Sequence, residues 1–227
     1  MKKYGLPVAN ADNVLKIVKS SGVADWKKVA NSAVVENCPE FNLFCREVEV
    51  KRRYKIEISQ FLSPNGEVFN FFRLAGGCGT RVFTLLDGGL VPICAEFQHG
   101  CGEVLFDLPG GRLEIGEDPA VCARREFEEE SGIILEKIIP LGSVGMPIAA
   151  RHFDARNFSF IGIASNPVES QLQKLDPDEY LKVVLVNLDD WLKLIEREVV
   201  QSYSVSTTLL ALRRLQGMGM LKRNYYA

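Results

Sequence analysis

The spacing of apolar positions changes several times along the chain, and each change predicts a different kind of element. Residues 1–44 carry apolar side chains at helical intervals in NADNVLKIVKSSG, and ADWKKVANS is consistent with a second, shorter helix. We therefore expect a peripheral helical extension over residues 1–44 and one larger domain over residues 45–227. The extension carries no recognisable chemistry.

From residue 45 onward the pattern favours strands. REVEVKRRYKIEISQFLSPNGEVFNFFRLA alternates and breaks at Asn65-Gly66, a strong hairpin signal, and TRVFTLLDGGLVPICAEF predicts a second hairpin around residues 87–89. Further strands are expected in VLFD, IIPLGSVG, FSFIGIAS and YLKVVLVNL, and two closing helices in LDDWLKLIEREVV and SVSTTLLALRRLQGM. This order predicts a mixed sheet covered by helices on both faces.

The stretch PGGRLEIGEDPAVCARREFEEESGI predicts a helix with well-marked ends. Asp118 is a typical N-cap, Pro119 suits the first helical position, and Gly132 suits a C-terminal stop. At about 100° per residue, one helix face carries the carboxylates of Glu126, Glu129 and Glu130. The face expected to pack on the sheet consists of Ala120, Ala123 and Phe127.

Neighbouring carboxylates on a helix repel one another, by roughly 0.2–0.5 kcal/mol for each close pair. Arginines one turn earlier, Arg124 before Glu128 and Arg125 before Glu129, relieve part of that repulsion. A solvated acidic face is the usual explanation for such a run. Beside a glycine turn with free carbonyl groups, the same carboxylates could instead form an oxygen-rich site for Mg²⁺ or Mn²⁺.

Composition narrows the class of protein without naming a function. The formal net charge is −2, which gives no support for nucleic-acid binding, and no apolar run approaches the ~20 residues of a membrane-spanning helix. The start MKKYGLPVANADN has no apolar segment typical of a secretory signal, so we expect a cytoplasmic protein without a membrane partner. Six scattered cysteines without a C-x-x-C pair favour buried free thiols over a zinc site.

The spacing of the residues around the acidic helix decides between a solvated face and a metal site. The fixed positions are, in order, Gly111, Glu117, Arg125, Glu126, Glu129, Glu130 and Gly132, with apolar residues at 127 and 133. This pattern matches the Nudix box, and the chain therefore resembles the Nudix hydrolases. The resemblance implies an α/β fold (α+β in other schemes), an α/β/α sandwich with a mixed sheet and N-terminal antiparallel hairpins.

The resemblance also implies a reaction and the roles of individual residues. Members of the family hydrolyse a nucleoside diphosphate linked to another group, with the help of divalent metal. Glu126 and Glu130 would be the main metal ligands, with Glu129 beside them and the backbone carbonyl of Gly110 often joining the metal shell. Arg125 would orient a box glutamate by a salt bridge. Glu117 would brace the preceding loop.

Outside the box, residues 45–215 resemble the branch of ADP-ribose and ADP-sugar pyrophosphatases, through EFQ…DLPGG and the C-terminal segment. This branch implies ADP-ribose or a nucleoside diphosphate sugar as the substrate, a nucleoside monophosphate such as AMP and a sugar phosphate as products, and a homodimer. Pro147 lies near a proline characteristic of the branch, although a plain turn is an equal interpretation. The alternatives are another nucleotide (NADH, a nucleoside triphosphate including oxidised forms, coenzyme A or a dinucleoside polyphosphate) or a non-catalytic nucleotide sensor.

One departure from the branch concerns the groups that would contact phosphate. Its members often read RQFR where this chain has AEFQ, so Gln98 stands in place of an arginine. Candidates to replace it are Arg112, Arg151 and Arg156, each of which is individually more typical of a surface arginine. His152 could contact phosphate or act as a base, or be a plain surface histidine. The acid expected from the loop after the box is one of Glu169, Asp176, Asp178 and Glu179, and the branch pattern favours Glu179.

Overall fold

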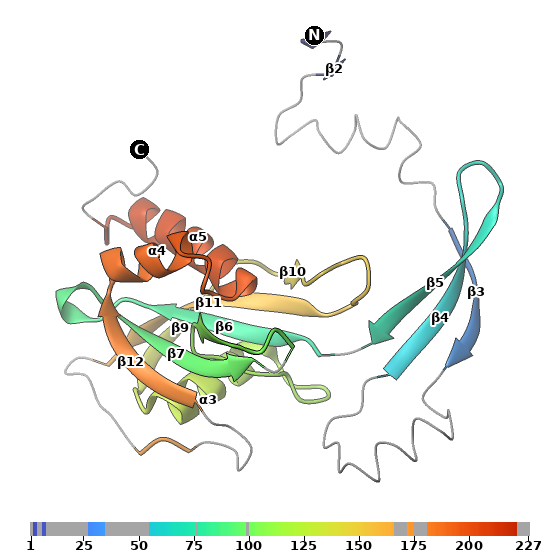
Figure 1. The fold of residues 1–227 in the computed structure, drawn as a ribbon. Coiled ribbons are helices and arrows are strands. Elements are labelled where there is room, and N and C mark those ends of the chain that lie inside the picture. The colour runs from blue at the N-terminus through green and yellow to red at the C-terminus, as the bar shows by residue number, and fades with distance from the viewer. Residues whose placement is uncertain are drawn as a thin grey trace. The chain divides into compact units, whose positions relative to one another are not determined.

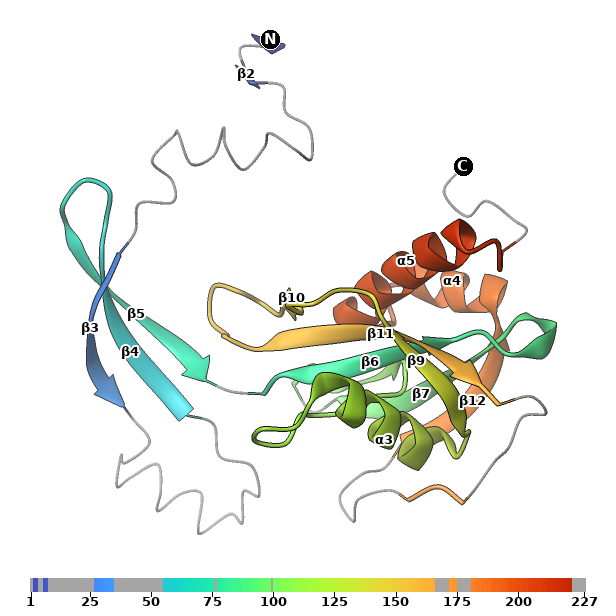
Figure 2. The same ribbon diagram turned by 180° about the vertical axis from the view of Figure 1, so that it is seen from behind.

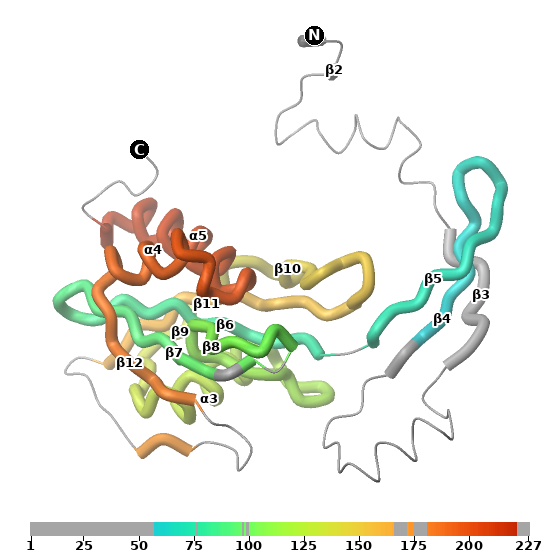
Figure 3. Tube along the Cα trace, in the orientation of Figure 1, coloured from blue at the N-terminus to red at the C-terminus, as the bar shows by residue number. Residues whose placement is uncertain are grey.

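The computed structural model describes residues 2–3, 6–7, 27–34, 55–75, 77–98, 100–165, 172–174 and 181–221. For residues 2–3, 6–7, 27–34, 55–56 and 97 only the backbone is described, and these are grey in Figure 3. The chain divides into two compact units. The first contains residues 1–76 and 151–154, and the second contains residues 77–150 and 155–227. Each unit is described by itself.

In the described part of the first unit, the strands pair antiparallel. Two short strands, β1 (Lys2–Lys3) and β2 (Leu6–Pro7), pair with each other. A three-stranded sheet has the order β3-β4-β5, with the bounds β3 Lys27–Val34, β4 Lys55–Leu62 and β5 Val68–Ala75. The turn between β4 and β5 contains Asn65 and Gly66, and the φ angle of Gly66 is 84°. The predicted first hairpin is therefore confirmed.

The second predicted helix of the N-terminal extension is wrong where the structure describes it. Lys27–Val34 forms strand β3, which pairs antiparallel with β4 from Lys27 opposite Leu62 to Val34 opposite Glu57. A helix of so few residues is marginal by itself, and pairing with a neighbouring strand supplies hydrogen bonds that the local pattern does not reveal. The first predicted helix lies outside the described residues. The division at residues 44 and 45 stays a prediction.

The second unit contains a mixed arrangement of strands together with the helices α3, α4 and α5. Strand β11 pairs parallel with β6 and antiparallel with β9 and β10, while β7 pairs antiparallel with β8 and β12. The bounds are β6 Gly79–Thr84, β7 Leu90–Gln98, β8 Glu103–Asp107, α3 Pro119–Ser131, β9 Leu135–Pro140, β10 Met146–Pro147, β11 Arg156–Ala164, β12 Leu181–Asn187, α4 Leu188–Glu196 and α5 Ser202–Gly217. The expected mixed sheet is thus confirmed.

The second predicted hairpin is wrong in its pairing, although its turn exists. A short 3₁₀ turn covers Asp87–Gly89, and an isolated bridge joins Leu86 to Leu90. The flanking strands β6 and β7 then enter different sheets, since β6 pairs with β11 and β7 lies between β12 and β8. The long-range parallel pairing of β6 with β11 replaces the local pairing that the turn suggests.

Successive residues of the central strands point to opposite faces, and each face is covered by helices. Val82 of β6 and Phe160 of β11 pack with α3, whereas Phe83 and Ile161 pack with α4 and α5. Figures 1 and 2 show α3 on one side of the strands and the α4–α5 pair on the other. The second unit is therefore the expected α/β/α sandwich. Within the described residues, none of the helices is both long and apolar enough to cross a membrane.

Candidate active site

Helix α3 begins and ends where the sequence predicts. The Asp118 side chain accepts hydrogen bonds from the backbone N–H groups of Ala120 (2.8 Å) and Val121 (3.3 Å), and Pro119 occupies the first turn. Gly132 adopts the left-handed conformation and donates its N–H to the carbonyl of Glu128 at 3.0 Å. The face against the sheet buries Cys122, Ala123, Phe127 and Glu130, with Ala120 packed beside them.

The two glycines before the helix allow close contacts, with the backbone of β6 at Gly110 and with a glutamate side chain at Gly111. At Gly110, whose φ is 143°, a Cβ atom would lie 2.3 Å from the backbone oxygen of Thr80. At Gly111, a Cβ atom would lie 2.2 Å from the carboxyl carbon of Glu126. The Gly111 carbonyl also accepts a hydrogen bond of 2.9 Å from the Thr80 N–H. The glycine turn therefore lies directly on strand β6 and against a box glutamate.

Glu130 is the most buried of the box glutamates, with an exposed fraction of 7%. Its Oε2 atom accepts a hydrogen bond of 2.8 Å from the Gly110 N–H, and the Cys94 thiol lies 3.6 Å away. Burial raises the pKa of Glu130 to about 8, although the Gly110 N–H and the positive charge of Arg81 act in the opposite direction. The site thus holds a carboxyl group that lacks a fully compensating positive charge.

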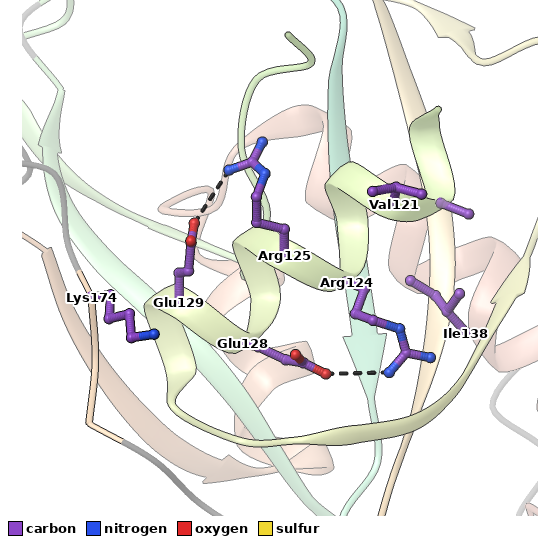
Figure 4. Close-up of a pocket in the computed structure, with 8 residues that line it drawn as sticks. Val121, Arg124, Arg125, Glu128, Glu129, Ile138 and Lys174 are labelled. Carbon is purple, nitrogen blue, oxygen red and sulfur yellow. Dashed lines mark hydrogen bonds and ion pairs between the residues drawn. The ribbon is translucent and has the colours of Figure 1, made fainter. Parts of the chain in front are cut away.

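Arg125 joins three box glutamates at one guanidinium group. It binds Glu117 through Nε and Nη2 at 3.0 and 3.1 Å, and its Nη1 atom lies 2.9 Å from Glu126 Oε1 and 3.2 Å from Glu129 Oε2. Glu117 also accepts a bond of 3.0 Å from the Glu114 N–H, and these contacts, led by Arg125, lower the pKa of Glu117. The predicted salt bridge of Arg125 and the contact of Glu117 with its loop are present. The Arg125–Glu129 pair is drawn in Figure 4.

The donors in this region suit a hard divalent cation. Glu126 and Glu130 offer carboxylate oxygens, and Gly110 offers a backbone carbonyl, which are the ligands that Mg²⁺ and Mn²⁺ prefer. Among the residues that the structure describes, no three acidic, cysteine or histidine side chains already form a group that could hold a metal ion. A divalent cation would supply the positive charge that the buried Glu130 lacks, so the residues fit such an ion.

The sequence does not reveal a largely buried ion pair next to the glycine turn, between Arg81 and Asp107. Arg81 of β6 donates from Nη1 to the carbonyl oxygens of Thr80 (2.6 Å) and Gly110 (2.7 Å), and from Nη2 to Asp107 Oδ2 (2.7 Å). Arginine is rarely buried in a strand, so the charged residue in the apolar run TRVFTLL was an available signal. Its partner Asp107, the last residue of β8, could not be inferred from the sequence, because only the fold brings the two residues together.

A surface hollow of about 570 Å³ lies along the outer side of α3. Its lining, shown in Figure 4, consists of Ala120, Val121, Arg124, Arg125, Glu128, Glu129, Ile138 and Lys174. It shares Arg125 and Glu129 with the box, but Gly110, Glu126 and Glu130 are absent from its lining. We therefore place the candidate active site at the glycine turn, because the buried carboxyl and the carbonyl donors meet there.

The predicted substrate contacts are spread over several elements. Gln98, on β7, donates from Nε2 to Glu96 Oε2 at 2.8 Å. Arg112 is exposed just after the glycine turn, and Pro147 is exposed in β10. Arg156 donates to the carbonyls of Val144 and Gly145 at 3.2 and 2.9 Å, which makes it a loop-bracing residue.

The remaining candidates lie in the first unit or outside the described residues. Arg151 and His152 are grouped with the first unit, where the His152 ring stacks on Phe72 with ring centroids 5.2 Å apart. The four candidate loop acids, Glu179 among them, lie outside the described residues. Of the cysteines, Cys94 and Cys122 are buried free thiols as expected, Cys78 is half-buried, and Cys101 is exposed, contrary to expectation.

Residues 80–206, more than half of the chain, match the model of the NUDIX domain. The chain therefore belongs to the Nudix family, whose members are hydrolases. The match spans the glycine turn, α3 and most of the elements of the second unit.

Individual relatives agree with this family. The chain is 29% identical over 137 residues to an ADP-ribose pyrophosphatase of Bacillus subtilis (strain 168), covering 60% of this chain and 72% of that protein. It is 24% identical over 171 residues to a methanol dehydrogenase activator of Bacillus methanolicus, covering 75% and 89%. A crystal structure of an ADP compounds hydrolase superposes with a TM-score of 0.62 at 18% identity, covering 87% of this chain and 95% of that chain, which supports the fold.

Proposed function

We propose that this chain hydrolyses the pyrophosphate bond of a nucleoside diphosphate linked to another group, with Mg²⁺ or Mn²⁺ as the cofactor. The substrate we propose is ADP-ribose or a nucleoside diphosphate sugar, which gives a nucleoside monophosphate and a sugar phosphate. The likeness to an ADP-ribose pyrophosphatase at 29% identity supports this substrate class.

The observation that carries the proposal is the contact between the glycine turn and the box glutamates. Glu130 is buried beneath Gly110 and receives its N–H, while the Glu126 carboxyl occupies the space where a Cβ of Gly111 would lie. Glu126 is paired with Arg125, whereas Glu130 has no such ion pair among the described residues, and a buried carboxylate is costly unless a positive charge joins it. A solvated acidic face would not bury its carboxylates against backbone atoms.

In the proposed reaction, the residues of this chain bind the cation and keep its ligands in position. Glu126, Glu130 and the Gly110 carbonyl would hold the cation, with Glu129 beside them, and Arg125 would keep the glutamates at a fixed spacing. When bound, a divalent cation neutralises charge on the pyrophosphate and lowers the pKa of an attacking water molecule. A loop acid, for which we favour Glu179, would accept the proton of that water.

The diphosphate of the substrate must also be contacted by residues of this chain. Gln98 is engaged by Glu96, and neither carries the positive charge that an arginine would bring to this position. Arg112, exposed next to the glycine turn, is the donor we favour in its place. Pro147, Arg151 and His152 stay candidates for contacts with the nucleotide or the sugar. NADH and nucleoside triphosphates therefore belong in the substrate test.

We also propose that the protein acts as a cytoplasmic homodimer. The sheet of the first unit carries large apolar side chains that are substantially exposed, namely Val68, Phe69, Phe71 and Phe72. Successive side chains of a strand point to opposite faces, so Phe69 and Phe71 lie together on one face of β5, with ring centroids 6.5 Å apart. Exposed aromatic side chains gathered on one face are typical of an interface. The free thiols at Cys78, Cys94, Cys101 and Cys122 are compatible with a reducing compartment. Light scattering on the purified chain, compared with a Phe69→Ser/Phe71→Ser variant, tests the dimer.

A substrate panel tests the reaction. The purified chain is incubated with Mg²⁺ and ADP-ribose, ADP-glucose, GDP-mannose, NADH or 8-oxo-dGTP. Phosphate is measured after phosphatase coupling, with pyrophosphate release used for the triphosphate. We expect turnover to be concentrated on ADP-ribose or a sugar nucleotide. Turnover confined to NADH or the triphosphate would contradict the substrate, and no turnover with clear nucleotide binding would favour the sensor alternative.

A matched pair of variants tests the site. Glu130→Gln should keep the fold and lose most of the metal-dependent turnover, because a neutral amide is a poor ligand for a hard cation. Glu128→Gln makes the same chemical change two residues away on α3, where the side chain binds Arg124 and the Leu135 N–H. It should keep wild-type turnover. Near-normal turnover of the Glu130 variant would remove the metal role assigned to this residue.

A further inference from the structure

The carbonyl of Gly110 is held by an arginine that reaches the glycine turn from the side of α5. Arg81 lies between Thr80 and Val82, whose side chains face α3, and its own side chain contacts Tyr203 of α5, with Cζ 4.5 Å from the ring centroid. From this side its Nη1 atom donates to the Gly110 carbonyl at 2.7 Å. The N–H of the same glycine donates to Glu130.

The arginine is itself fixed by a second set of contacts. Its Nη2 atom binds Asp107 Oδ2 at 2.7 Å, and the other carboxyl oxygen of Asp107 accepts bonds from the Leu108 N–H at 2.9 Å and from the Ser204 hydroxyl. The guanidinium group therefore joins β6, the end of β8 and the start of α5 to the glycine turn. A planar fork can make these bonds at once, which a lysine ammonium could not do in the same geometry.

Stability of the fold is an insufficient reason for this arrangement. The Nε atom of Arg81 is buried and makes no hydrogen bond among the described residues, which leaves part of its desolvation uncompensated. Replacing a buried ion pair by apolar groups of similar volume is often neutral or stabilising. Among the hydrogen bonds of the described residues, the bond to the Gly110 carbonyl is the one that links Arg81 directly to the candidate site.

We propose that Arg81 is a positioning residue for the metal site, which fixes the direction of the Gly110 carbonyl while Asp107 and Tyr203 fix Arg81. The inference rests on the proposed function, since it takes the Gly110 carbonyl as a metal ligand. Arg81 acts through the backbone of the glycine turn and is not itself a ligand. Groups that orient metal ligands commonly change metal affinity by about 10- to 100-fold when they are removed.

The test measures metal binding directly, without substrate. Mn²⁺ binding is followed by electron paramagnetic resonance for the wild-type chain, Arg81→Met, Arg81→Lys and the control Arg124→Met. Arg124 is a suitable control because it binds Glu128 and the Leu135 carbonyl on the outer side of α3, away from Gly110. We expect Arg81→Met to lose about tenfold or more in Mn²⁺ affinity. We expect Arg124→Met to keep the wild-type affinity.

Two further measurements test whether Arg81 acts by positioning the Gly110 carbonyl, by its positive charge alone, or by stabilising the fold in general. Arg81→Lys keeps the charge but lacks the fork, so it should restore little of the lost affinity. Amide hydrogen exchange at Gly110, measured without metal, should accelerate in Arg81→Met and stay unchanged in Arg124→Met. If Arg81→Met fails to fold, Asp107→Asn carries the test, because it keeps the arginine and removes the charge that holds it. That variant should also lose Mn²⁺ affinity.

The outcomes distinguish this inference from the function on which it rests. A wild-type chain that binds no Mn²⁺ overturns the metal site, and this inference with it. A wild-type chain that binds Mn²⁺ and a folded Arg81→Met that binds it equally well overturn the role of Arg81 alone. An equal loss in Arg124→Met, or full recovery in Arg81→Lys, would show general loosening or charge alone and would also overturn the positioning role.

Discussion

Replacing the buried Glu130 by glutamine should make the metal-free protein more stable, even though it removes a residue of the candidate site. In the unfolded chain this carboxyl group ionises at its ordinary pKa of 4.5, whereas burial raises the pKa in the fold to about 8. Between these two values the unfolded state binds fewer protons than the folded state, so the stability of the wild-type chain falls as the pH rises. Glutamine has no such titration and keeps an oxygen for the Gly110 N–H.

The size of the effect follows from the two pKa values. One pKa unit corresponds to about 1.4 kcal/mol, so the cost of keeping Glu130 in the fold is roughly 3 kcal/mol at pH 7 and roughly 5 kcal/mol above pH 8. The advantage of Glu130→Gln in the free energy of unfolding should therefore grow by about 4 kcal/mol between pH 5 and pH 8.5. At pH 5 the variant's advantage should be only about 1 kcal/mol.

Urea unfolding in the presence of EDTA at a series of pH values measures this difference. Tryptophan fluorescence is a suitable signal, since Trp191 is fully buried in the core of the second unit. Adding Mg²⁺ provides the internal control, because the cation should stabilise the wild-type chain by mass action and leave the glutamine variant unchanged. A difference that does not vary with pH, or a variant that is less stable at pH 8.5 without metal, would refute the reasoning.

Three other substitutions probe the helix and its turn. Gly111→Ala places a Cβ atom 2.2 Å from the carboxyl carbon of Glu126. Because the Glu126 side chain is flexible, it can move away, so the circular dichroism melting curve should change little. Turnover should fall sharply, because the displaced carboxylate no longer lies at the metal site. Asp118→Ala removes the N-cap of α3 and should cost about 1 kcal/mol in a urea titration, with turnover retained. Phe127→Ala empties a fully buried position and should cost about 3–5 kcal/mol by the same assay, and a smaller loss would contradict its place in the core.

Local chemistry made the acidic helix predictable. Asp118, Pro119 and Gly132 act on neighbouring backbone groups, so their roles as helix ends can be inferred without tertiary structure, and the structure confirms them. The pairing of Arg125 with Glu129 is likewise an effect of helical spacing. The spacing of the box residues predicted membership of the Nudix family, and the match over residues 80–206 confirms it.

Features that depend on distant parts of the chain escaped prediction. The stretch 27–34 forms a strand because β4 lies beside it, and β6 leaves its expected hairpin because β11 pairs with it. The contact of Arg81 with Gly110 requires β6, β8 and α5 to be assembled first. Helical spacing predicts one common face for Glu126, Glu129 and Glu130, but it does not reveal that Glu130 is buried with Ala123 and Phe127 against the sheet.

The alternation of Val82 and Phe83 on a single strand has a consequence for cooperativity. One residue belongs to the core under α3 and the next to the core under α4 and α5, and Phe160 and Ile161 of β11 repeat this arrangement. If either core loses its order, β6 and β11 lose the side-chain contacts on one of their two faces. The second unit should consequently unfold as one body. Helix α3, which carries the glutamates, should therefore depend for its structure on α4 and α5, although these pack in the other core.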